Sequence, residues 1–298
     1  MNRITKYLLL TVAVAAMTLS CREWRNRQTP TRGSITVMVD QTVYPIMLDE
    51  VDMFGHTYKY THIELLGLPG QTIVDSLMHS DSLRVAIMAR DLTENEKNWF
   101  ENRRVRPCIN EIAYDAIALI ANRANGPKSI SEQELKDILT GTANPRSFKL
   151  VFDNSHSSTV QYMMEFAGVD SLPATWVFSA SSTLELMEHL SKNVNSIGFI
   201  GVNWLYEPDG EVRRFIDKVG ALSVGSGAEA RQPTQNNIAE GSYPFVRTIR
   251  IVNCQGNAGL GLGLASFVAG DVGQRIILKS GLTPFVMPKR EINVREKI

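Results

Sequence analysis

Hydroxyl and guanidinium side chains follow three separate apolar, strand-like stretches of this chain. Thr42, Arg90 and the run Ser157-Ser158-Thr159 each lie just after such a stretch, and a helix-like pattern begins near each of them. The first amides of a helix have no partner within the helix, and donors of these kinds beside them suit a tetrahedral oxyanion. Because junctions from strand to helix share one edge of a parallel sheet, we expect these donors to converge on a single anion site.

Each of these positions also has a simpler explanation. Ser157 or Ser158 could be an ordinary N-cap that binds nothing, which is the commonest use of such residues. Arg90 could form a surface ion pair with Asp91 or Glu94. The convergence of three junctions is what favours a binding site over isolated caps.

The elements that must position these donors alternate between strands and helices at the start of the chain. Apolar residues at every second position predict strands, and apolar residues at helical spacing predict helices. Thr93 and Glu96 have the spacing of a capping box. The order β-α-β-α-β-α predicts a parallel sheet with helices on its faces. The expected strands are residues 34–40, 58–66 and 83–89, and the expected helices are residues 44–54, 71–79 and about 93–104.

Residues 112–122 are almost wholly apolar, which fits either a buried strand or a core helix. We interpret them as a strand that passes from one domain to the next. A loop rich in Gly, Ser, Gln and Asn is expected at 223–241, followed by a second crossing strand within 243–253. The other expected strands are residues 148–152, 175–179 and 197–205, and the other expected helices are residues 131–139, 182–193, 264–279 and the helix after the hydroxyl cluster.

The composition excludes several classes of protein. The chain has 298 residues with 31 basic and 31 acidic side chains, so its charge does not favour nucleic acid as a partner. Apolar residues make up 44%, which is enough for real cores, and the length suggests about two domains. Cys108 and Cys254 could pair in an exported protein or remain two buried free thiols.

The N-terminus reads as a targeting segment. Arg3 and Lys6 precede an apolar run, residues 7–16, which is too short to span a membrane comfortably. Cys21 follows small and polar residues, which resembles the lipidation site of a bacterial lipoprotein signal over residues 1–21. The alternative is a plain secretory signal with an incidental cysteine. Residues 22–33 lack periodicity and predict a tether.

Motifs for catalysis or cofactor binding are weak. The run Gly-Leu-Gly-Leu-Gly at residues 259–263 lacks the spacing and the position of a dinucleotide fingerprint. None of the histidines has a nucleophile or a metal-ligand partner at a recognised spacing. We therefore expect no catalytic residue, no metal and no cofactor. The histidines are His56, His62, His79, His156 and His189.

Several segments together resemble the substrate-binding receptors of phosphate-specific ABC transporters. Residues 243–247 (Tyr-Pro-Phe-Val-Arg) are similar to the family's Tyr-Pro crossing strand. Residues 113–120 (Ala-Tyr-Asp-Ala-Ile-Ala-Leu-Ile) resemble the strand that enters its second domain. Residues 265–276 and 279–284 resemble its closing helix and turn. The resemblance covers most of residues 34–290.

This resemblance implies an α/β fold of the type II periplasmic-binding-protein class. Such a fold has two lobes, each a central mixed sheet flanked by helices, and two crossing segments. One lobe would contain residues 34–114 plus 244–298, and the other would contain residues 115–243.

The family's ligand positions can be carried over to this sequence. The family binds phosphate with hydroxyls, main-chain amides and usually an arginine. Its Ser-Gly-Thr loop falls on Ser157-Ser158-Thr159. Its first-lobe threonine falls on Thr42, with Val43 contributing an amide, and a further ligand position falls near Arg90.

Two departures from the family pattern bear on the ligand. The arginine that usually precedes the loop would fall on Asp153. A carboxylate there would repel a bound dianion unless it accepts the remaining proton of the phosphate or points away. The middle glycine of the loop is replaced by Ser158.

The function implied by the resemblance is that of an exported, lipid-anchored binding protein of the cell envelope, in the periplasm or on the outer surface. It would capture inorganic phosphate or a similar oxyanion as a monomer and deliver it to an ABC transporter permease. It would not be an enzyme, and nucleic acid would not be a partner. The alternative is a ligand-free structural or interaction lipoprotein with the same fold. A phosphate-ester hydrolase ranks lower because a paired base and nucleophile are missing.

Overall fold

The structure is a computed structural model that describes residues 28–206, 208 and 210–288. The expected signal peptide, Cys21 and most of the expected tether lie outside the described residues. Within the described ranges, no helix is both long enough and apolar enough to cross a membrane.

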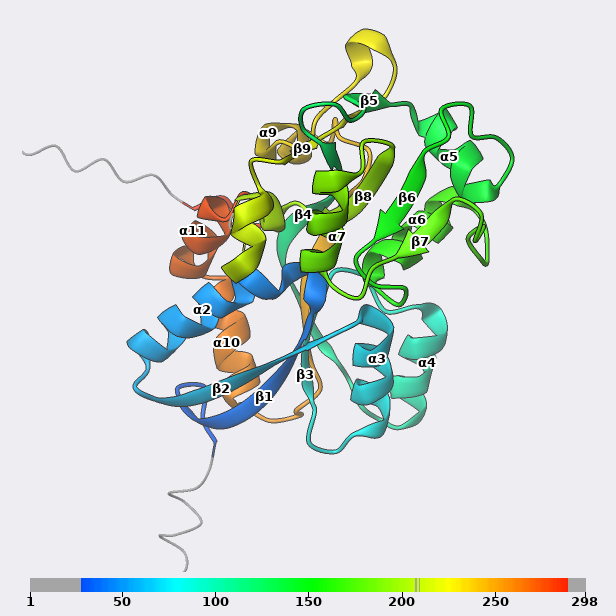
Figure 1. Ribbon diagram of the computed structural model, residues 1–298. Helices are drawn as coiled ribbons and strands as arrows, with labels where there is room; N and C mark the ends of the chain where they lie inside the picture. The colour runs from blue at the N-terminus through cyan, green and yellow to red at the C-terminus, as the bar shows by residue number, and fades with distance from the viewer. Residues whose placement is uncertain (1–27, 207, 209, 289–298) are drawn as a thin grey trace, which may run out of the picture.

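A mixed sheet forms the lower lobe in Figure 1, with strand order β2-β1-β3-β11-β4. Its strands are β1 (Arg32–Asp40), β2 (Tyr60–Leu68), β3 (Val85–Met88), β4 (Cys108–Asn122) and β11 (Val246–Asn253). β1 is parallel to β2 and to β3, whereas β11 is antiparallel to β3 and to β4. The carboxyl ends of β1 and β3 therefore meet at one edge, as the sequence predicts.

The long strand β4 continues into the upper lobe. There it pairs with β8 (Ser196–Gly201) and β9 (Val219–Ala221), and β6 (Lys149–Phe152) and β7 (Val177–Ser179) extend the sheet beyond β8. Residues 112–121 are buried or nearly so. The interpretation of this apolar run as a strand that passes between lobes is therefore confirmed.

A second segment runs beside β4 where the chain returns to the lower lobe. Tyr243 and Phe245 are buried there. The Tyr243 hydroxyl donates to the Ile117 carbonyl at 2.8 Å, and the Ile117 amide donates to the Phe245 carbonyl at 2.9 Å. The predicted two-lobed α/β fold with two crossing segments is confirmed. The division at residues 114/115 and 243/244 remains a prediction.

Helices cover both faces of each sheet (Figure 1). In the lower lobe, α2 (Tyr44–Thr57), α10 (Leu260–Val268) and α11 (Asp271–Lys279) lie on one face, and α3 (Gly70–His79) and α4 (Glu94–Asn102) lie on the other. In the upper lobe, α7 (Thr183–Lys192) lies opposite α5 (Glu132–Thr140) and α6 (Ser158–Ala167).

Short elements fill the connections. Part of the expected loop at 223–241 is ordered as β10 and α9. The short elements are β5 (Ser129–Ile130), α8 (Asn203–Tyr206), β10 (Ser223–Val224), α9 (Gln235–Ala239), β12 (Thr283–Pro284) and the 3-10 turns η1 (Gln41–Val43), η2 (Gly210–Phe215) and η3 (Gly227–Glu229).

Two sequence predictions of secondary structure were wrong. The helix expected over 264–279 is two helices, α10 and α11, separated at Ala269-Gly270. The glycine-rich run belongs to the start of α10, where a Cβ on Gly263 would lie 1.8 Å from the Pro30 carbonyl oxygen. Gly263 therefore allows close packing against the N-terminal segment. The strand expected over 197–205 ends at Gly201, and α8 follows it.

Candidate ligand site between the lobes

A buried ion pair joins the two strands that connect the lobes. Arg247 of β11 donates from Nε and Nη2 to Asp115 Oδ2 of β4, at 2.8 and 2.6 Å. The two residues lie opposite each other in the strand register, and both are buried. Burial raises the pKa of the Asp115 carboxyl, and the charge and hydrogen bonds of Arg247 oppose that rise. The pair fixes the guanidinium in one orientation at the junction of the lobes.

The remaining nitrogen of that guanidinium reaches the start of α6. Arg247 Nη1 donates to Ser158 Oγ at 2.9 Å and more weakly to Thr159 Oγ1 at 3.4 Å. Because both hydroxyls accept from Arg247, their own protons remain available for another acceptor. Ser157 is the N-cap of α6, and its Oγ accepts from the Val160 amide at 3.4 Å. This corner therefore combines hydroxyl donors with the positive end of a helix.

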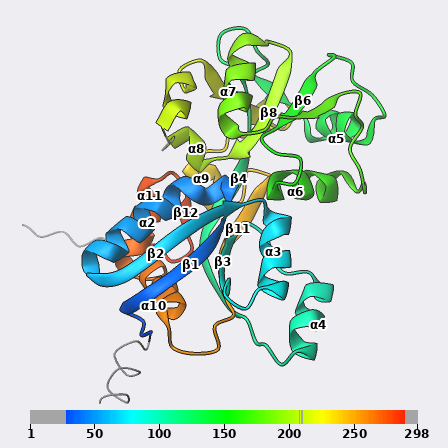
Figure 2. The same ribbon diagram turned by 60° about the horizontal axis from the view of Figure 1, so that its bottom comes forward.

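The end of β1 and the start of α3 face α6 from the lower lobe, and Figure 2 shows α6 directly above α3. Asp40 Oδ1 accepts from the Thr42 amide at 3.0 Å and from the Thr42 hydroxyl at 2.8 Å. A Cβ on Gly70 would lie 3.2 Å from Asp40 Oδ2 and 3.2 Å from the Ser158 Cβ. The two lobes therefore touch here, and glycine permits the approach.

Thr42 also approaches the upper lobe at the end of β8. A Cβ on Gly201 would lie 2.7 Å from the Thr42 carbonyl oxygen and 2.8 Å from Asn203 Oδ1. The same atom would lie 3.3 Å from Asp115 Oδ2. Thr42, Asp115 and Asn203 are thus neighbours across the junction. Asn203 is buried, and neither of its side-chain polar atoms has a hydrogen-bond partner among the described residues.

Asp153, directly after β6, is a second carboxyl beside Asp40. It is 4% exposed, and its Oδ1 has no hydrogen-bond partner within the described part of the chain; the same holds for Asp40 Oδ2. Burial, and then the charge of Asp40, raises the pKa of Asp153 to about 6, while the Ser157 hydroxyl and the charge of Arg247 oppose the rise. Two unpaired carboxyl oxygens therefore lie near the hydroxyl corner.

A cavity of about 500 Å³ adjoins Asp153 between the lobes. The lower lobe contributes the end of β2 and the start of α2 to its wall, and the upper lobe contributes the start of α7, α8 and η2. Gly67 allows a close approach there, since a Cβ would lie 3.2 Å from the ring of Tyr44. The lining residues are Gln41, Tyr44, Gly67, Asp153, Ser181, Ser182, Thr183, Leu184, Trp204, Gly210, Glu211 and Val212.

The structure brings most of the predicted site residues together. Thr42 and Val43 are buried in η1, and Ser157, Ser158 and Thr159 are buried at the start of α6. Gly70 and Asp40 link the two groups across the cleft, as described above. Ser157 also has the capping role that the simpler explanation assigns to it.

Arg90 is separate from this group in its contacts. Its Nη1 and Nη2 donate to Glu96 at 2.9 and 2.8 Å, and Nη1 also donates to the Asp91 carbonyl at 2.7 Å. Glu96 accepts from the Thr93 amide as well, so the capping box predicted at α4 is present. The ion pair anticipated as the alternative for Arg90 exists, with Glu96 as the partner rather than Asp91 or Glu94.

Sequence reasoning missed Arg247, Asp115 and Asp40 as members of this site. A usable signal was present for the first two, because each is a charged residue within an apolar crossing strand. A buried charge needs a partner of opposite sign, and the two crossing strands are the places to look for one. Asp40 gave no such signal, because an acidic residue that ends a strand is common in turns.

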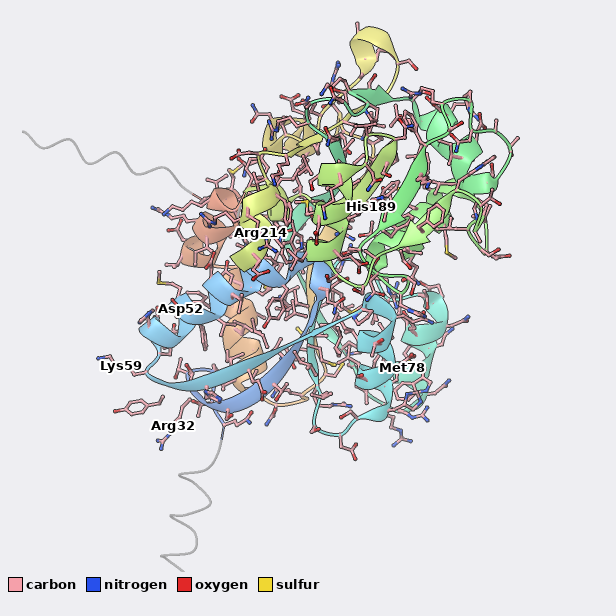
Figure 3. All side chains as sticks on the ribbon, viewed as in Figure 1. Arg32, Asp52, Lys59, Met78, His189 and Arg214 are labelled. Atoms are coloured by element: carbon pink, nitrogen blue, oxygen red, sulfur yellow. The ribbon has the colours of Figure 1, made fainter. Side chains whose placement is uncertain are left out.

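The other chemically reactive side chains lie elsewhere. Cys108 is exposed and Cys254 is buried, and both are free thiols. Burial raises the pKa of the Cys254 thiol to about 11. His189 of α7, labelled in Figure 3, exchanges a hydrogen bond with the Ser196 hydroxyl at 3.0 Å. Among the described residues, no cluster of His, Cys, Asp and Glu could hold a metal ion.

Comparison with known proteins places the chain in a family. Residues 26–272 match the family described as the PBP superfamily domain. The phosphate-binding protein PstS of Pseudomonas aeruginosa is 22% identical over 309 aligned positions, which cover 95% of this chain and 93% of that protein.

Solved structures with the same fold include two phosphate-transport proteins. A phosphate ABC transporter substrate-binding protein with bound phosphate, from Clostridium perfringens, has a TM-score of 0.71 at 22% identity, covering 85% of this chain and 100% of that one. An ABC-type phosphate transport receptor from Vibrio cholerae has a TM-score of 0.62 at 19% identity, covering 84% and 99%. The family match spans well over half of the chain, and this protein therefore belongs to the PBP superfamily.

Proposed function

We propose that this protein is an extracytoplasmic solute-binding protein that captures inorganic phosphate or a similar oxyanion between its lobes. The contact of Arg247 with Ser158 and Thr159 carries the proposal. It holds two hydroxyls at a helix start with their protons free to donate, beside a fixed guanidinium. The phosphate-binding relatives support the same class of ligand.

The proposed ligand set keeps five positions from the sequence and changes one. Arg247 takes the role of the arginine in place of Arg90, because both terminal nitrogens of Arg90 already donate to Glu96. The proposed donors are the Val43 amide, the hydroxyls of Ser158 and Thr159, and the guanidinium of Arg247. The hydroxyls of Thr42 and Ser157 join them once they turn from Asp40 and Asp153 to the anion.

We expect binding to occur by closure of the two lobes. Gly70 and Gly201 are two points where the lobes approach each other closely. Opening about the two crossing segments would admit the anion, and closure would exclude water and strengthen each hydrogen bond to it. The closed form would then be presented to the permease of an ABC transporter.

The proposal also includes a location in the cell envelope and attachment to a membrane. Lipidation at Cys21 would anchor a monomer to the envelope in the periplasm or on the outer surface. Radiolabelled palmitate should be incorporated by the wild-type chain and not by Cys21→Ala. No chemical reaction is proposed for the site.

Titration calorimetry with inorganic phosphate tests the site directly. Ser158→Ala should weaken phosphate binding at least tenfold, because a donor to a buried anion is lost while the Arg247–Asp115 pair is kept. Ser155→Ala is the matched control, since Ser155 is an exposed serine of the same loop whose Oγ contacts His156. Equal affinities of wild type and Ser158→Ala would remove this corner from the site.

A ligand-free interaction protein with the same fold is the second candidate. The unpaired carboxyl oxygens of Asp40 and Asp153 favour it, because ionised carboxylates disfavour a bound dianion. A thermal-shift panel of phosphate, sulfate, arsenate and small carboxylates separates the two candidates. A rise in melting temperature with phosphate supports the receptor, and no rise with any anion supports the alternative.

A further inference from the structure

The cleft contains more negative charge than a phosphate site alone would need. Arg247 is matched by Asp115, and Asp40 and Asp153 are two further carboxyls in the same cluster. Asp40 is 1% exposed and Asp153 is 4% exposed, and each has one oxygen without a hydrogen-bond partner among the residues described. Buried carboxyl oxygens are ordinarily paired, so each of these two has the capacity to accept a hydrogen bond from a ligand.

The cavity beside Asp153 is larger than a tetrahedral anion requires. Its volume of about 500 Å³ falls within the range of sites for small organic ligands. The hydroxyl corner at Ser158 and Thr159 is not part of the cavity lining, whereas Asp153 is. Asp153 also receives a hydrogen bond from Ser157, the N-cap of α6. It therefore stands between the corner that suits an oxyanion and a space that suits an organic group.

The wall of this cavity has the chemistry of a cation site. Tyr44 comes from the lower lobe and Trp204 from the upper lobe, and aromatic rings attract ammonium groups through their faces. Glu211 lies at the rim and forms an ion pair with Arg214 at 3.1 Å; Figure 3 shows Arg214 on the upper lobe above α2. Asp153 is thus the buried acid of the cavity lining, and its Oδ1 has no hydrogen-bond partner among the described residues.

We propose that the ligand of this protein is a zwitterion, an organic phosphate or phosphonate that carries an ammonium group. The oxyanion would bind at Ser158, Thr159 and Arg247, and the ammonium group would donate to Asp153 with the rings of Tyr44 and Trp204 beside it. This inference rests on the proposed function, because it assigns the oxyanion to the same corner. It adds the substrate class and a specificity-determining role for Asp153.

Phosphoethanolamine and ethyl phosphate are matched probes, because they share the phosphate monoester and only the first has an ammonium group. Titration calorimetry at pH 7.5 should show phosphoethanolamine binding at least tenfold more tightly than ethyl phosphate. Asp153→Asn should reduce this ratio to within about twofold, since the amide keeps the shape and loses the charge. The ratio, rather than either affinity alone, reports the ammonium contact.

Asp52→Asn provides the matched control for the substitution. Asp52 is an exposed aspartate of α2, paired with His56 and labelled at the outer part of the lower lobe in Figure 3. It should leave the ratio of the two affinities unchanged. The melting temperature of Asp153→Asn, measured without ligand, should equal or exceed that of the wild type, which shows that the variant is folded.

The outcomes separate this inference from the proposed function. Equal or tighter binding of ethyl phosphate, or a ratio that survives Asp153→Asn, overturns the zwitterion and leaves the oxyanion receptor intact if inorganic phosphate binds. Failure of all three ligands, inorganic phosphate included, overturns both. A tenfold preference for phosphoethanolamine that is lost in Asp153→Asn supports the proposal.

Discussion

Two arginine–carboxylate pairs of the described residues, Arg90–Glu96 and Arg247–Asp115, lie in different settings. Arg90 and Glu96 are six positions apart, and Glu96 also caps α4, so this pair closes a local loop. Arg247 and Asp115 are 132 positions apart and join the two crossing strands. The side chains of Arg90 and Glu96 are 15% and 18% exposed, whereas those of Arg247 and Asp115 are 3% and 0% exposed. The comparison shows that chemically similar pairs can have different roles: one fixes a helix start, and the other fixes a guanidinium between lobes.

Removing Arg247 should have the largest effect. Arg247→Ala leaves Asp115 buried without its partner, and such a change costs about 3–5 kcal/mol of unfolding free energy. Denaturant unfolding followed by circular dichroism measures the loss. Arg250→Ala is the control, because Arg250 lies on the same strand and pairs with Glu111, which is 37% exposed. A loss for Arg247→Ala no greater than that for Arg250→Ala would contradict the structural role of the buried pair.

Glu50 extends the comparison to a buried acid that has no partner among the described residues. Neither carboxyl oxygen has a hydrogen bond within the described residues, and burial, then the charge of Asp49, raises the pKa of Glu50 to about 8. The folded state holds this proton more tightly than the unfolded state, so stability falls as pH rises from about 4.5 to 8. Glu50→Gln should therefore stabilise the protein by about 2–4 kcal/mol at pH 9 and hardly at all at pH 4.

Thermal unfolding of wild type and Glu50→Gln across that pH range tests this expectation. The exposed substitution Glu64→Gln on β2 controls for the general effect of removing a negative charge. A difference between wild type and Glu50→Gln that does not grow with pH would mean that Glu50 has a partner in solution.

Asp153 should behave like Glu50 with a smaller amplitude. Its pKa of about 6, against an ordinary value of 3.8, means that stability is lost as pH rises between these values. Asp153→Asn should stabilise the ligand-free protein by about 1–2 kcal/mol at pH 7.5, with no gain at pH 3.5. Calorimetric melting at the two pH values measures the change. Equal stabilisation at both pH values would assign the effect to packing rather than to charge.

Arg90→Ala should have the smallest effect on ligand binding. If Arg90 touched the anion, as its position after a strand predicts, its removal would weaken binding at least tenfold. Its ion pair with Glu96 predicts instead a change in phosphate affinity of less than about twofold, with a loss of about 1 kcal/mol in stability. Titration calorimetry with phosphate decides between these expectations. A tenfold loss would return Arg90 to the ligand set.

Much of the fold could be predicted from the sequence because its signals are local. Alternation of apolar residues marked β1 and β2, a short apolar run marked β3, and the Thr93–Glu96 spacing marked the start of α4. The break between α10 and α11 was missed, although Gly270, the N-cap of α11, stands at it and glycine has low helix propensity. The start of α10 was missed because its glycines have low helix propensity, and Gly263 is the one that packs closely against Pro30.

The sequence alone determined which corners carry donors. Thr42, Arg90 and residues 157–159 follow strands, and this can be inferred from the order of residue types alone. Tertiary structure decided which arginine reaches the hydroxyls. Arg90 pairs with a carboxylate only six residues along the chain, whereas Arg247 reaches Asp115 and Ser158 only because the crossing strands pair and α6 packs against them. The reason is physical: a local partner can be inferred from spacing, but a buried charge selects a distant partner only after the backbone has brought the two together.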